Sequence, residues 1–153
     1  MTNALRDELR PFETAVTVPD RFDAQLWFIG RIHTPWTLRG DCPRRGDPDQ
    51  GPVCRVEVFE PWAEGLRGVD GRDRLQLLYW MDRARRDLVL QNPNFGNRAT
   101  GTFALRSPVR PNPVASSVVR LLAVEGPVLV VRGLDCLDGT PLIDIKAEFG
   151  AVP

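Results

Sequence analysis

A loop with three prolines carries side chains that suit a binding site for a polar or anionic ligand. Its sequence, Arg106-Ser107-Pro108-Val109-Arg110-Pro111-Asn112-Pro113, places two guanidinium groups and one amide close together. Each proline fixes φ at about −65° and lacks an amide hydrogen, so the loop can be neither a helix nor a central strand. Because a stiff loop loses less entropy when a ligand orders it, we expect a preorganised site here. A solvated linker of similar composition is the alternative.

A second segment, Leu134-Asp135-Cys136-Leu137-Asp138-Gly139-Thr140-Pro141, contains a strong turn signal. Asp-Gly between two apolar runs is typical of a hairpin, and most such turns only reverse the chain. Here one connection would present Asp135, Asp138, Thr140 and Asp144 within a short span, with Lys146 following. Taken with the proline-rich loop, the turn is a candidate site.

Together these segments resemble the TsaA-like family, which includes TrmO-type tRNA methyltransferases. Family members have a stretch close to G-x-F-A-T-R-S-P-F-R-P-N-P-I-G-x-S and, further on, L-D-x-x-D-G-T-P-x-x-D-I-K-P-Y. This chain is similar to the first over residues 101–113 and to the second over residues 134–146. Residues 29–36 are similar to the family's opening strand, I-G-x-I-x-S-P-F/Y. The resemblance therefore covers most of the chain.

The resemblance implies a β-barrel that binds S-adenosylmethionine, usually as a homodimer with the cofactor near the subunit interface. It also implies a tRNA partner, because the family's tRNA enzymes methylate N6 of threonylcarbamoyladenosine next to the anticodon. Two alternatives stay open. One is a methyltransferase of the same fold that acts on another RNA or a small molecule, and the other is a non-catalytic S-adenosylmethionine-binding or nucleotide-binding protein.

The cofactor would contact several separate parts of the chain. The family's Q-P-G loop aligns with Arg44-Arg45-Gly46, and the pair that ends its buried strand aligns with Met81-Asp82. Arg106 suits the cofactor's carboxylate, whereas Asp138 suits its ammonium or ribose hydroxyls and the turn amides beside it suit the adenine edge. The expected cofactor-binding residues are Arg45, Gly46, Met81, Asp82, Arg106, Ser116, Leu137, Asp138, Gly139 and Thr140.

Methyl transfer from a sulfonium is an in-line displacement, so most of the rate can come from positioning, and the acceptor nitrogen must also lose a proton. Asp144 and Lys146 lie two residues apart and would share one face of a strand. Asn112 could hold the acceptor, and Tyr79 is the chain's only tyrosine. These four residues are the candidate catalytic residues. An exposed Asp144–Lys146 ion pair without a catalytic role is the alternative.

The chain departs from the family pattern on the acceptor side. The family's F-S-H-L-W is replaced by Arg-Asp-Arg-Leu-Gln over residues 72–76, so its histidine and tryptophan are absent. The I-G after Pro113 is Val114-Ala115, and the final P-Y is Ala147-Glu148. Cofactor binding is therefore better supported than any particular methyl acceptor.

Hydropathy predicts a mainly β fold. Residues 53–59 alternate between apolar and polar side chains, and residues 75–81 are apolar nearly throughout, as in a buried strand. We expect a small antiparallel β-barrel of about seven strands with short helices and long loops. The alternating strands and helices and the Gly-rich turn of a Rossmann-type methyltransferase are absent. The expected strands are residues 26–32, 53–59, 75–81, 100–105, 118–124, 128–134 and 142–145.

Residues 1–24 are expected to form an N-terminal extension with a short helix over residues 4–9, and residues 25–153 a single barrel domain. Residues 82–97 are polar and are expected to form a long loop. With 153 residues, the chain can bury roughly two-thirds of its unfolded surface. No apolar run approaches the roughly 18 residues of a membrane helix, and the charged N-terminus does not resemble a signal peptide. We therefore expect a cytoplasmic protein.

Cysteine and charge content narrow the function further. The three cysteines have no CxxC spacing and His33 is the only histidine, so we expect free thiols and no metal site. Formal net charge is zero, which argues against a strongly electrostatic nucleic-acid binder. The basic residues other than Lys146 are nevertheless arginines, which suit phosphate contacts and base stacking, although a solvated surface explains each cluster equally well.

Overall fold

The computed structural model describes residues 8–150 of the chain. These residues divide into two compact units. The smaller unit combines residues 8–25 with 81–115, and the larger combines residues 26–80 with 116–150. Among the described residues, no helix is long and apolar enough to cross a membrane.

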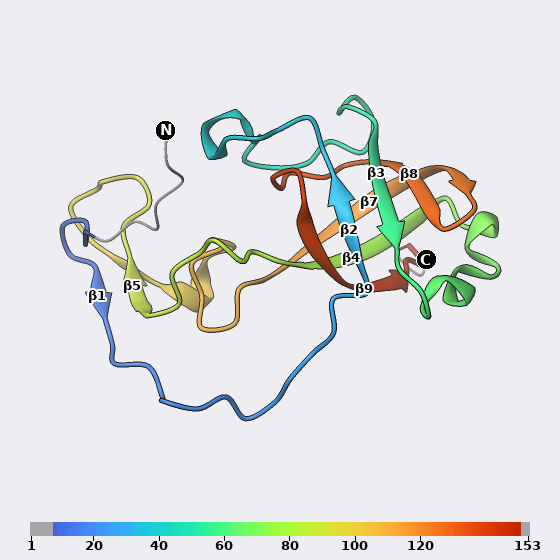
Figure 1. The fold of residues 1–153 in the computed structure, drawn as a ribbon. Helices are drawn as coiled ribbons and strands as arrows, with labels where there is room; N and C mark the ends of the chain where they lie inside the picture. The colour runs from blue at the N-terminus through green and yellow to red at the C-terminus, as the bar shows by residue number, and fades with distance from the viewer. Residues whose placement is uncertain (1–7, 151–153) are drawn as a thin grey trace. The chain divides into compact units, whose positions relative to one another are not determined.

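The larger unit is built on a closed antiparallel barrel of six strands, which confirms the expected mainly β fold with one strand fewer (Figure 1). The strands follow one another around the barrel in the order β2-β3-β8-β7-β4-β9. Three short 3-10 helices, η1 (Arg39–Asp41), η2 (Ala63–Leu66) and η3 (Val69–Gly71), lie in the connections. The strands are β2 (Gly30–His33), β3 (Cys54–Val58), β4 (Arg74–Trp80), β7 (Val114–Glu125), β8 (Val128–Arg132) and β9 (Thr140–Ala147), of which β7 begins in the smaller unit.

Alternation along the strands builds the core of the barrel. In β3, Cys54, Val56 and Val58 are buried, whereas Arg55 and Glu57 between them are not. Burying each apolar side chain contributes roughly 1.5–3 kcal/mol of transfer free energy. The same pattern in the other strands places further residues in the core: Ile32, Leu75, Leu77, Tyr79, Val119, Leu129, Val131 and Leu142.

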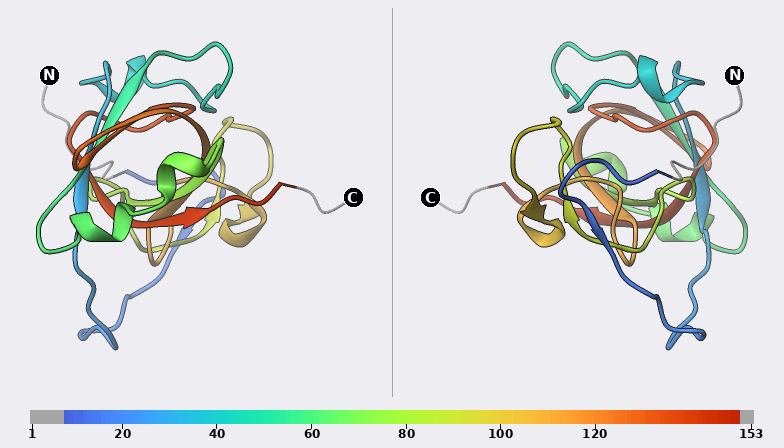
Figure 2. Two further views of the ribbon diagram at one scale, coloured as in Figure 1. Left: turned by 90° about the vertical axis from the view of Figure 1, so that its right-hand side faces the viewer. Right: turned by 90° about the vertical axis from the view of Figure 1, so that its left-hand side faces the viewer.

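The smaller unit contains a three-stranded sheet in the order β1-β5-β6. Its strands are β1 (Thr14–Ala15), β5 (Leu88–Gln91) and β6 (Thr100–Gly101), followed by the 3-10 helix η4 (Thr102–Ala104). Figure 2 shows the ribbon of the chain in two further views.

Three expected elements are corrected. Residues 82–97 are not all loop, because β5 pairs with β1 on one side and with β6 on the other. The expected strand 100–105 ends after Gly101, where the buried Thr102 turns its hydroxyl to the carbonyl of Leu88 at 2.7 Å. The strand expected over residues 26–32 begins only at Gly30. The expected helix over residues 4–9 lies mostly outside the described residues.

Candidate functional site

The Asp138-Gly139 turn leads into β9 and is hydrogen-bonded to the end of β2 and the residues after it. Gly139 adopts φ +82°, a conformation that glycine reaches without a steric penalty. The amide of Gly139 donates to the carbonyl of Ile32 at 2.8 Å. The amide of Asp138 donates to the carbonyl of Trp36 at 2.7 Å, and the amide of Thr140 donates to the carbonyl of Leu137 at 3.2 Å. All three amides donate within the chain, and their expected contact with adenine stays a prediction. The exposed side chain of Asp138 is available to bind a ligand.

The Asp138 carboxylate is anchored from two sides. Its Oδ1 atom accepts the amide of Thr34 at 3.1 Å and lies 3.5 Å from Nδ1 of His33. The other ring nitrogen of His33, Nε2, lies 3.2 Å from Oε2 of Glu57 on β3. The Asp138 side chain is nevertheless 43% exposed, so it combines a fixed position with access for a ligand. Sequence reasoning missed His33 and Thr34, since only the β2–β9 register brings them to the turn.

The loop that carries Arg45 and Gly46 packs against the chain just after β8. A Cβ atom at Gly46 would lie 1.8 Å from the carbonyl oxygen of Gly133, so only glycine permits this approach. In the same loop, partial burial raises the pKa of the Cys42 thiol, and the nearby Asp135 carboxylate raises it further. The loop therefore lies beside the segment that leads into the Asp138 turn. Arg45 itself is exposed.

Tyr79 is only 1% exposed and lies in the barrel core. Its hydroxyl donates to Oδ1 of Asp135 at 2.6 Å and lies 2.7 Å from Oγ of Ser117. Burial raises the pKa of the phenol far above its ordinary value, and the Asp135 carboxylate adds to this shift. Tyr79 therefore stays protonated at neutral pH, and its contacts favour a structural role that holds Asp135 in place.

Asp144 and Lys146 form an ion pair on β9, with Oδ2 and Nζ 2.8 Å apart. Both side chains are about half exposed, which matches the structural alternative for this pair. Asp144 is four residues beyond Thr140, roughly 13 Å along a strand, so it does not lie at the turn.

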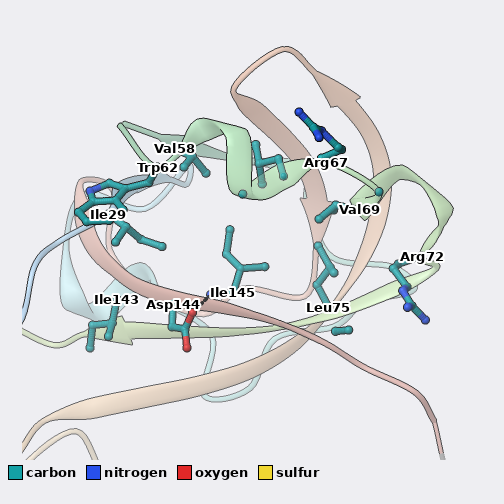
Figure 3. A pocket seen from close by; sticks show the side chains of 14 residues that line it. Ile29, Val58, Trp62, Arg67, Val69, Arg72, Leu75, Ile143, Asp144 and Ile145 are labelled. Carbon is teal, nitrogen blue, oxygen red and sulfur yellow. Dashed lines mark hydrogen bonds between the residues drawn. The ribbon is translucent and has the colours of Figure 1, made fainter. Parts of the chain in front are cut away.

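Asp144 instead lines a pocket of about 480 Å³ whose wall contains both apolar and charged side chains (Figure 3). In this view Ile145 and Asp144 leave β9 on opposite sides. The pocket lies at the end of the barrel where β2 begins and β9 ends, and residues of η2 and η3 form part of its wall. It is therefore separate from the Asp138 turn.

In the smaller unit, Arg86 and Gln91 hold the proline-rich loop. Arg86 donates through Nε to the carbonyl of Pro111 at 2.5 Å and through Nη2 to Oδ1 of Asn112 at 3.1 Å. Gln91 is buried and donates to the carbonyl of Val109 at 2.6 Å. Sequence reasoning missed both residues because residues 82–97 were expected to be loop. The apolar triplet before Gln91 was the available signal.

The two arginines of the loop differ in their surroundings. Arg110 donates through Nη1 to the carbonyls of Leu105 and Ser107 at 2.8 and 3.1 Å, so it stabilises the loop itself. Arg106 is exposed, as the expected ligand contact requires. Nearby in the unit, the amide of Met81 donates to the carbonyl of Pro113 at 2.9 Å.

The predicted site residues thus fall into both units. The smaller unit holds Met81, Asp82, Arg106 and Asn112, and the larger holds Arg45, Gly46, Tyr79, Ser116, Leu137, Asp138, Gly139, Thr140, Asp144 and Lys146. In the larger unit, Oγ of Ser116 accepts Nε2 of Gln76 at 2.9 Å. Within residues 8–150, no group of three or more His, Cys, Asp or Glu side chains is arranged to hold a metal ion.

Comparison with known proteins gives consistent matches. Residues 31–150 match the family model described as the tRNA-methyltransferase O N-terminal domain. The probable S-adenosyl-L-methionine-binding protein VirR of Rhizobium radiobacter is 51% identical over 140 residues, covering 92% of this chain and 79% of that protein. The S-adenosyl-L-methionine-binding protein of Archaeoglobus fulgidus is 41% identical over 118 residues, covering 77% of this chain and 84% of that protein.

A solved structure agrees with the sequence matches. The crystal structure of TrmO from Pseudomonas aeruginosa is similar with a TM-score of 0.68 and 30% sequence identity. The match covers 86% of this chain but only 60% of that one.

Proposed function

Because the chain belongs to the tRNA-methyltransferase O N-terminal domain family, a family of S-adenosylmethionine-dependent methyltransferases, we propose that it methylates N6 of an adenosine in tRNA. The proposed acceptor is threonylcarbamoyladenosine next to the anticodon. The observation that carries the cofactor half of this proposal is the anchored, accessible carboxylate of Asp138 in the family's D-G-T-P turn.

The residues of this turn fit the cationic groups of S-adenosylmethionine. An ionised carboxylate that is already held by the Thr34 amide and by His33 can accept hydrogen bonds from an ammonium or a ribose diol without further ordering. When bound, the cofactor supplies an electrophilic methyl group on a sulfonium. Arg106 remains the proposed contact for the cofactor's carboxylate, to which a guanidinium can donate in bidentate fashion.

On the acceptor side, Asn112 is the residue proposed to hold the methyl acceptor. Its Oδ1 atom accepts Arg86, which fixes the amide plane and directs the Nδ2 donors. An amide held in this way suits a carbonyl of a carbamoylated base. Asp144 is the proposed proton acceptor, and its Oδ2 atom lies 2.8 Å from Nζ of Lys146.

We also propose a homodimer, because a barrel of only six strands rarely encloses a whole cofactor. A cytoplasmic location is proposed with it, since that is where a tRNA substrate would be met. Light scattering of the purified protein with and without S-adenosylmethionine measures its oligomeric state. A monomer that binds the cofactor with full affinity would count against the dimer.

The test of the main proposal is incubation of the protein with labelled S-adenosylmethionine and total RNA from cells that lack it. We expect label in the tRNA fraction, at an adenosine next to the anticodon. Label in another RNA or in a small molecule would support a different acceptor. Cofactor binding without any labelled product would support the second candidate, a non-catalytic binding protein, which is favoured by the description of two relatives as S-adenosyl-L-methionine-binding proteins.

A further inference from the structure

The hairpin that joins β5 and β6 carries an exposed phenylalanine at its tip. Phe95 lies in the connection between Gln91 and Thr100, which are paired across the hairpin. Its side chain is 66% exposed, and the guanidinium of Arg10 lies 4.3 Å from the ring centroid. Such a cation–π contact covers one face of the ring and polarises it. The ring is therefore presented to solvent as a flat stacking surface.

The orientation of Phe95 is fixed by its surroundings. Arg10 donates through Nη1 to the carbonyls of Asn92 and Pro93 at 3.3 and 2.9 Å, which holds the guanidinium in place. The buried Asn92 side chain accepts the amide of Gly96 at 2.8 Å and donates to its carbonyl at 2.9 Å. Phe95 itself adopts φ +54°, which is rare for a bulky residue. A strained residue with an exposed aromatic ring indicates a function rather than a packing requirement.

Charge identifies the kind of ligand. Within the smaller unit, residues 88–115 contain no aspartate or glutamate, but they contain three arginines: Arg98, Arg106 and Arg110. Arg98 follows the tip of the hairpin by three residues, and the tip also carries the exposed amides of Asn94 and Asn97. The chain as a whole is neutral, so this stretch is locally cationic. An aromatic ring with cationic and amide neighbours suits unpaired bases on a phosphate backbone.

We propose that the hairpin loop of residues 92–98 binds single-stranded RNA, with a nucleobase stacked on the free face of Phe95. The inference rests on the proposed function, since it places an unpaired base of the tRNA substrate on this loop. The stack binds the substrate and takes no part in methyl transfer.

The test measures binding of a labelled anticodon stem-loop RNA by fluorescence anisotropy. Phe95→Asn removes the ring and tolerates the positive φ, so it keeps the loop conformation. We expect it to weaken binding by roughly 5- to 150-fold, the range for loss of one base–aromatic stack. Phe95→Trp should bind within about two-fold of wild type, because it keeps a stacking surface. Phe22→Ala is the control, since Phe22 is also exposed and contacts Arg86, but it lies in the segment Asp20-Arg21-Phe22-Asp23, which has more acidic than basic residues.

The outcomes separate this inference from the proposed function. If wild type methylates tRNA but Phe95→Asn binds the RNA equally well, only the stacking site is overturned. Equal losses with Phe95→Asn and Phe22→Ala would overturn it too, because the effect would not be specific to the hairpin. If wild type binds S-adenosylmethionine but neither binds nor methylates RNA, the tRNA acceptor and the stacking site both fail.

Discussion

The Nδ1 atom of His33 lies 3.5 Å from Oδ1 of Asp138, so the end of β2 fixes the carboxylate of a turn that is far away in the sequence. On the other side of the ring, Nε2 lies 3.2 Å from Glu57 of β3. His33 thus links the Asp138 turn to two neighbouring strands of the barrel. The position of Asp138 is a property of the barrel rather than of the turn alone.

Replacing Asp138 should weaken cofactor binding more than replacing its anchor. For Asp138→Ala we expect a loss of roughly 10- to 150-fold in affinity for S-adenosylmethionine, since a charge-assisted hydrogen bond contributes about 1.5–3 kcal/mol. His33→Ala should cost only a few-fold, because the Thr34 amide still holds the carboxylate. Calorimetry measures both, with the exposed Asp70→Ala as control. Wild-type affinity in Asp138→Ala would show that the turn does not bind the cofactor.

Turnover should separate the acceptor side from the cofactor side. Asn112→Ala and Asp144→Asn are expected to keep affinity for S-adenosylmethionine but to lose most of the methylation rate. The reason is that both proposed roles concern the methyl acceptor: Asn112 donates a hydrogen bond to it, and Asp144 takes a proton from it. Lys146→Ala tests the alternative, since it removes the ion pair and leaves the carboxylate. Initial rates at saturating cofactor measure each variant. If Asn112→Ala and Asp144→Asn both react at the wild-type rate, these residues are not catalytic.

Tyr79→Phe should lower stability rather than chemistry. The variant removes the hydroxyl that donates to Asp135 at 2.6 Å, leaving a partly buried carboxylate without this donor. We expect the free energy of unfolding to fall by about 1–3 kcal/mol, with methylation by the remaining folded protein unchanged. Urea denaturation followed by fluorescence gives the first quantity. A variant of normal stability that has lost turnover would instead identify Tyr79 as catalytic.

The sequence predicts the barrel better than it predicts the site. Alternation in β3 and the apolar run of β4 depend on local spacing, so both strands are visible in the sequence. The strand β5 was missed because its four residues lie inside a polar stretch and pair on both sides with very short strands.

The contacts of the site depend on register, which spacing alone does not reveal. Tyr79 and Asp144 are both conspicuous in the sequence, but one is buried in the core and the other lines a pocket away from the turn. His33 drew attention only as the sole histidine, and its contact with Asp138 follows from the pairing of Ile32 with Thr140. Residues brought together by long-range pairing are those that sequence reasoning misses.

Alkaline pH should destabilise the barrel through its buried thiols. Burial raises the pKa of Cys54 from 9.0 to about 11 and also raises that of Cys136. Between about pH 9 and pH 11, the Cys54 thiol has lost its proton in the unfolded chain but keeps it in the folded chain. The free energy of unfolding therefore falls as pH rises. Below about pH 9 these thiols should have no effect. Urea unfolding of wild type and Cys54→Ala across this range measures the difference, and an equal slope for both would rule out Cys54 as its source.

Gly46→Ala should displace the loop that carries Arg45, because its Cβ atom would lie 1.8 Å from the carbonyl oxygen of Gly133. The atom it would meet belongs to the backbone of Gly133, which cannot move aside as the end of a flexible side chain can. The loop must therefore move away from the end of β8. We expect the free energy of unfolding to fall by roughly 1–3 kcal/mol, the usual cost of overpacking. We also expect affinity for S-adenosylmethionine to fall, since the same loop is a proposed cofactor contact.

Gly40→Ala is the matched control in this connection, because a Cβ there meets nothing within 4 Å. Denaturation and calorimetry on the two variants check both effects. Loss of stability with full cofactor affinity in Gly46→Ala would show that the loop supports the barrel but does not bind the cofactor.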